Sequence, residues 1–182
     1  MKDNTTLMLK ILYVLSWVIF VGLCIQAGGF IFNSFFTLVL NPVGARHFWQ
    51  EVDLSGLYRY DPGYFFVVTM IMSIVAIAKA YLFYLIIQVL GGKKLNMSQP
   101  FSHPVGKLIF MMSYMAFLIG IFSFWGVAQY VWLLKKGVML PDLQTLHFGG
   151  GDVWLFMGVT LYVIAQIFKK GIELQTENEL TV

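Results

Sequence analysis

Charge is scarce in this chain: only 12% of its 182 residues are charged, whereas 59% are hydrophobic. An ordinary soluble domain has about 25% charged residues, so this composition excludes that class. Cysteine is rarer still, with Cys24 as the single residue. One cysteine cannot form an intramolecular disulfide or supply a Cys-x-x-Cys redox pair.

Motifs of common enzymes are also missing. The sequence contains no Gly-x-Ser-x-Gly, no His-Glu-x-x-His and no phosphate-binding glycine loop followed by Lys-Ser/Thr. The histidines, His47, His103 and His147, all lie outside the long apolar stretches. A joint metal site of His47 and His147, helped by Asp53 or Asp142, is the weaker alternative, because isolated loop histidines are usually solvated. We therefore predict no enzyme, no catalytic residue, no cofactor and no resident metal.

Four long apolar stretches account for the hydrophobicity. Lys79 is the only charged residue within them. A membrane-spanning helix needs about 20 apolar residues at about 1.5 Å each. We predict an all-α membrane protein with a four-transmembrane-helix bundle. It forms a single domain over 1–182, with helices at about 11–33, 64–90, 108–134 and 151–170 and a short cytoplasmic tail at 171–182.

The first stretch is longer than one perpendicular span requires. Residues 11–45 would form a helix about 52 Å long. This length, and the absence of an Ala-x-Ala cleavage site, favour a retained helix over a signal peptide. The helix must either tilt in the membrane or break near Gly28-Gly29 and continue above it.

Lysine and arginine counts predict the orientation. The N-terminus, the 91–107 loop and the tail hold seven of these residues, whereas the 41–63 and 135–152 loops hold four. We therefore predict that both termini are cytoplasmic and that two loops of about 20 residues are external. Within the first loop, residues 53–58 suit a short surface helix. The net charge of +3 gives no reason to expect direct binding of nucleic acid.

Lys79 is the leading candidate for a ligand site, since a charge at this depth is rare and usually faces the protein interior. Gln26, Asn33 and Gln129 are candidate neutral partners. Three alternatives stay open: a purely structural lysine, a counter-charge for an anionic ligand such as a lipid headgroup, fatty acid or peptide carboxylate, and an ion pathway. A small transporter, channel subunit or lipid-binding bundle centred on Lys79 is thus one functional hypothesis.

Small residues at helical spacing predict how the helices pack. One stripe lies on the second predicted helix and another on the third, and we expect them to face each other in an antiparallel pair. The same faces leave a homo-oligomer open as an alternative. The stripes consist of Thr69, Ser73, Ala76 and Ala80, and of Ser113, Ala116, Gly120 and Ser123.

Segments outside the helices carry a family resemblance. Ser98-Gln99-Pro100-Phe101-Ser102 precedes the third stretch, and Glu179-Leu180-Thr181-Val182 ends the chain soon after the fourth. With Asn41-Pro42-x-Gly44-Ala45 and Asp53-Leu54-Ser55, this order resembles a bacterial membrane-protein family called domain of unknown function 2975 (DUF2975). The resemblance implies a multi-pass protein of the cytoplasmic (inner) membrane, without an established enzymatic activity.

Members of that family are often encoded beside a small helix-turn-helix regulator. The resemblance therefore implies a regulatory or sensory membrane protein that binds such a regulator in the cytoplasm. An acidic and hydrophobic tail could dock a basic DNA-binding surface, although a solvated extension of the fourth helix is the alternative. The candidate partner-binding residues are Phe101, Leu174, Glu177, Glu179, Leu180 and Val182.

Overall fold

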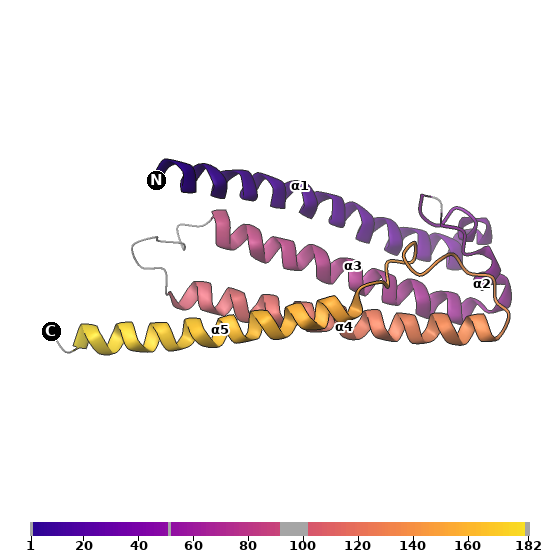
Figure 1. Cartoon of the computed structure of the whole chain (residues 1–182). Helices are drawn as coiled ribbons and strands as arrows, with labels where there is room; N and C mark the ends of the chain where they lie inside the picture. Colours follow the sequence, from indigo (N-terminus) through magenta and orange to yellow (C-terminus); the bar gives the residue numbers. More distant parts are fainter. Residues whose placement is uncertain (1, 51, 92–101, 181–182) are drawn as a thin grey trace.

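Four long antiparallel helices dominate the protein (Figure 1). The computed structural model describes residues 2–50, 52–91 and 102–180, with the side chains of 7–50, 52–91 and 102–177. The long helices are long and apolar enough to cross a bilayer, which confirms the predicted all-α architecture. They are α1 (Lys2–Phe35), α3 (Pro62–Gly91), α4 (His103–Lys135) and α5 (Gly151–Leu180).

Both termini lie at the same end of the bundle (Figure 1). We call it the terminal end: α1 and α4 begin there, and α3 and α5 end there. At the opposite end, the loop end, three short elements connect α1 to α3. These are the π-helix η1 (Phe36–Leu40), the 3-10 helix η2 (Pro42–Ala45) and α2 (Ser55–Tyr60). The α2 helix is a short helix in the first loop, two residues later than the predicted range 53–58.

The first helix does not break at its glycine pair. It stays α-helical through Gly28-Gly29 and ends as a turn of π-helix, so the alternative of a break was wrong. Gly29 instead makes room for another segment, because the ring of Trp49 occupies the space of a Cβ there. One turn further, the Asn33 side-chain amide donates a hydrogen bond to the carbonyl oxygen of Phe48 at 2.6 Å. The loop after η2 is thereby held against α1.

The long helices pack as a row in the order α1, α3, α4, α5. Between α1 and α3, the Phe20 and Tyr84 ring centroids lie 6.0 Å apart. Between α3 and α4, the rings of Tyr64 and Trp132 lie 4.9 Å apart near the loop end. Each neighbouring pair is antiparallel, so the row fixes which residues share a level along the bundle.

The two small-residue stripes do not face each other, and that prediction was wrong. Thr69 and Ser73 line a groove of α3 that is shared with α1. On α4, the Ser113 hydroxyl donates to the carbonyl oxygen of Gly158 on α5 at 2.9 Å, and Gly120 lies against Leu155. The order of the helices explains the difference. Besides each other, α3 packs against α1 and α4 packs against α5, and the small residues lie at these outer contacts.

The second predicted outer loop does not stay at the loop end. Residues 136–150 run back along the helices, so that α5 begins partway down the bundle (Figure 1). Leu146 and Phe148 are buried, and the Phe148 ring fills the space beside Gly126 of α4. These apolar side chains cover the part of α4 that the late start of α5 leaves open.

The level at which α5 begins follows from its contact with α4. A Cβ built on Gly151 would lie 3.4 Å from the carbonyl oxygen of Gly120. Gly120 is more than four helical turns before Lys135, or about 22 Å along the axis. The first turn of α5 therefore lies near the middle of α4.

We expect Gly120→Val to force α4 and α5 apart. Its Cβ would lie 2.6 Å from the Leu155 side chain and 3.1 Å from the Gly151 carbonyl oxygen, whereas a Cβ at Gly22 would meet nothing within 4 Å. Overpacking typically lowers the free energy of unfolding by about 1–3 kcal/mol. Thermal unfolding in detergent should therefore show a lower melting temperature for Gly120→Val than for the control Gly22→Val. Equal melting temperatures would contradict this contact.

Candidate functional site: a lysine beside the first turn of α5

Lys79 lies on α3 and is half-buried. Its ammonium nitrogen is 5.7 Å from the centroid of the Trp154 ring, which belongs to the first turns of α5. A cation over an aromatic face gains about 0.5–2 kcal/mol. The lysine is thus held inside the bundle by an aromatic ring, a partner that the sequence analysis did not identify.

His147 brings the second loop to the same place. Its ring centroid is 5.7 Å from that of Phe30 on α1. Its backbone has a φ of 59°, which is uncommon for a residue other than glycine. Burial, followed by the positive charge of Lys79, lowers the pKa of His147 below its ordinary value of 6.5. The imidazole is therefore neutral at pH 7 and adds no second cation.

The start of α5 adds a further positive field. Gly150 has a φ of 77°, a conformation that favours glycine, and the helix begins at the next residue. The first N–H groups of a helix have no intrahelical acceptor and carry the positive end of its dipole. Asp152 in the first turn is exposed.

Ser123 of α4 lies against Gly151 and is completely buried. Its hydroxyl has no hydrogen-bond partner in the described part of the chain.

Of the three predicted partners of Lys79, Gln26 lies at the same height along the bundle as the lysine. The register of α1 on α3 follows from Phe20 beside Tyr84, and it brings Gln26 level with Ala78 and Lys79. Gln26 is half-buried and lies one turn before Phe30. It is therefore the candidate polar neighbour that α1 offers to this region.

The other two predicted partners lie elsewhere. The Asn33 amide is used to hold the carbonyl oxygen of Phe48. Gln129 is half-buried on α4, nine residues beyond Gly120 and so about 14 Å further toward the loop end. The row of helices therefore does not bring Gln129 to Lys79.

Among residues 7–50, 52–91 and 102–177, no carboxylate forms an ion pair with Lys79. The ion pair of Lys170 with Glu173, at 3.1 Å, lies on the surface of α5. The same ranges of the chain contain no group of three or more His, Cys, Asp or Glu that could hold a metal ion. Asp53 and Asp142 accept hydrogen bonds from the backbone of Ser55 and Thr145. Together with the helix start, Lys79 suits an anionic group.

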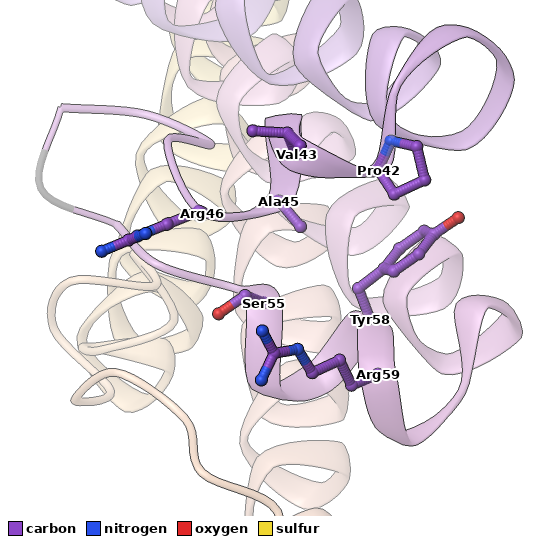
Figure 2. A pocket seen from close by; sticks show the side chains of 7 residues that line it. All are labelled: Pro42, Val43, Ala45, Arg46, Ser55, Tyr58 and Arg59. Atoms are coloured by element: carbon purple, nitrogen blue, oxygen red, sulfur yellow. The ribbon is translucent and has the colours of Figure 1, made fainter.

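A hollow lies near the loop end, lined by residues that the sequence did not single out as ligand-binding. Figure 2 shows side chains of η2 and of α2 around it, including Arg59, together with Arg46, which directly follows η2. It measures about 360 Å³. Neither arginine makes an ion pair within 4.0 Å in the part of the chain that the structure describes. Since the two arginines are 13 positions apart, with an irregular segment between them, no sequence periodicity indicates that they line the same hollow.

Four of the six predicted partner-binding residues lie at the far end of α5. The helix continues to Leu180, so most of the predicted tail is its last part. Leu174 is 50% exposed, and Glu177 is exposed as well. Glu179 and Leu180 belong to the helix. Phe101 and Val182 lie outside the described residues.

These features define a multi-pass helical membrane protein with an unneutralised lysine in its interior. A family model described as "Protein of unknown function (DUF2975)" matches residues 49–182. The chain therefore belongs to the DUF2975 family, as the sequence resemblance indicated. No curated protein and no solved structure matches it.

Replacing Lys79 should change the titration of His147. Because the lysine charge contributes to the lowered pKa of His147, we expect Lys79→Met to raise that pKa toward the ordinary value. Nuclear magnetic resonance of labelled histidine rings, recorded against pH in detergent micelles, measures the shift. Lys10→Met, which removes an exposed charge of α1, is the control and should leave the His147 titration as in the wild type. An unaltered His147 titration would show that the two groups do not interact.

Proposed function

We propose that this protein is a membrane receptor that binds an anionic group at Lys79 and a cytoplasmic regulator at the end of α5. The observation that carries the proposal is the course of α5. This helix starts beside Lys79, with Trp154 under the ammonium group, and continues without interruption to Leu180 at the terminal end. One rigid element therefore touches both the ligand site and the partner-binding segment.

The ligand half of the proposal rests on electrostatics. Non-helical backbone at membrane depth is tolerated where it is buried in protein or lines a cavity, and broken helices in transporters direct their N-termini at anionic substrates. Here the buried residues Leu146 and Phe148 precede the start of α5, and Lys79 lies beside it. A carboxylate or phosphate on an amphiphile would neutralise both the ammonium group and the helix start.

The partner half rests on the length of α5. Gly106 in the first turn of α4 lies against Ile172, which puts Gln175 level with His103, so residues 176–180 extend beyond the start of α4 by about 8 Å. The lysine distribution predicts that this end is cytoplasmic. Leu174 and Glu177 are exposed there, and a mixed apolar and acidic surface complements the basic face of a DNA-binding protein. The family resemblance implies a small helix-turn-helix regulator as this partner.

Leu174→Ser tests the partner surface without disturbing the bundle, because Ile172 rather than Leu174 packs against α4. We expect binding of a purified helix-turn-helix regulator of the kind that the family resemblance implies to weaken by about tenfold or more, as for a residue central to an interface. Binding to the full-length protein in nanodiscs is measured directly. Leu7→Ser, at a comparably exposed leucine of α1, is the control. Equal binding to all three proteins would remove α5 from the partner surface.

Lys79→Met tests the ligand site. We expect an anionic lipid or small molecule to co-purify with the wild-type protein from its native membrane, and to be lost in Lys79→Met because the counter-charge is gone. Mass spectrometry of the extracted small molecules makes the comparison. Lys10→Met, which removes an exposed charge of α1, should retain the ligand. Ion or solute flux in liposomes that disappears with Lys79→Met would instead support the transporter or channel-subunit alternative.

A further inference from the structure

A groove lies between α4 and α5 at the terminal end, far from Lys79. It measures about 410 Å³. The basic residues at its mouth come from both helices: His103 and Lys107 from the start of α4, and Lys169 from α5. Its walls are otherwise apolar and aromatic, with Phe110, Met111 and Tyr114 following one another up α4.

We infer that this groove is a binding site for an anionic phospholipid. Two lysines and a histidine at one end would hold the phosphate of the headgroup, and the apolar wall would hold the first part of an acyl chain. Basic pockets between transmembrane helices near a membrane surface bind anionic headgroups in this way. The inference does not depend on the proposed ligand at Lys79 or on the proposed partner.

The order of the lining residues matches the depth profile of a lipid. From Lys107 to Tyr114 the chain makes about two helical turns, or about 10 Å. The charged residues lie toward the end of the span and the aromatic ones toward its interior. Phe110 also meets Tyr162 of α5, with ring centroids 5.7 Å apart. A headgroup at the lysines therefore places its acyl chains along the apolar wall.

Charge complementarity favours an anion over a zwitterion. Glu173 is the acidic residue closest in sequence to Lys169, and its carboxylate pairs with Lys170 at 3.1 Å. Lys170 does not line the groove. Lys107 and Lys169 are both exposed, so their ammonium groups are accessible to a lipid phosphate. The positive group of a zwitterionic headgroup would lie close to the same lysines. Its repulsion would cancel most of the attraction between the lysines and the phosphate.

The floor of the groove is a direct contact between α4 and α5. A Cβ at Gly106 would lie 3.6 Å from Ile172 and 4.0 Å from Phe168, which are ordinary van der Waals distances. The two helices therefore touch at this point. Lys107 and Lys169 consequently flank the same groove although they lie 62 positions apart in the sequence.

The test is retention of lipid by the full-length protein. The protein is reconstituted in nanodiscs with equal amounts of phosphatidylglycerol and phosphatidylcholine, released, and weighed by native mass spectrometry. We expect the wild type to retain phosphatidylglycerol selectively. Lys107→Gln with Lys169→Gln should lower this retention by about 25-fold, since each lysine near a membrane surface contributes about fivefold. Lys170→Gln, which removes a neighbouring charge outside the groove, should behave as the wild type.

A second variant separates the groove from general surface charge. Met111→Trp fills the apolar wall and leaves both lysines in place, and it should also lose phosphatidylglycerol. Thermal unfolding of every variant establishes that it is folded. Retention of both lipids in proportion to their supply would mean a non-selective lipid shell and overturn the inference. So would a folded Lys107→Gln/Lys169→Gln protein that retains phosphatidylglycerol as the wild type does.

Discussion

The close contact of α4 with α5 is the constraint on which the rest of the structure depends. Gly120 has no side chain, so the first residue of α5 can lie against the α4 backbone halfway along that helix. The chain before it must therefore cross the same depth without being helical. In a bilayer such a segment has to be covered by protein. The burial of Leu146 and Phe148 against α4 provides this cover, and it carries His147 toward Lys79.

An excess of positive charge inside the bundle is the second consequence of this arrangement. The start of α5 and the Lys79 ammonium group lie together, and both favour a negative charge. Trp154 offsets part of the cost through its ring, by about 0.5–2 kcal/mol. His147 relieves it further by staying neutral, because its pKa is lowered. A purely structural lysine would gain more from an acidic partner, and the residues described around it do not supply one.

Local sequence patterns were enough to predict the long helices and to single out Lys79. Most of the residues around Lys79 are brought there by tertiary contacts, which such patterns do not show. Apolar length and charge scarcity were sufficient to predict the four long apolar helices. Periodicity identified Ser113 and Gly120 as contact residues, but it cannot say which neighbour they meet, and the structure turns them to α5. The depth of the second loop depends on Gly120 and Gly126, far away in sequence. For the same reason Trp154 was missed and Gln129 was wrongly grouped with Lys79.

The ends of α5 are physically coupled because they belong to one continuous helix. On the proposed function, a ligand at Lys79 would shift the first turn of α5, and Lys169 would move with it. A phospholipid held between Lys107 and Lys169 ties the same helix to α4 and resists that shift. Coupling of this kind is reciprocal. If the lipid stabilises one position of α5, the ligand must supply the same free energy to shift the helix away from that position. The lipid composition of the membrane would thus set the ligand sensitivity of such a receptor.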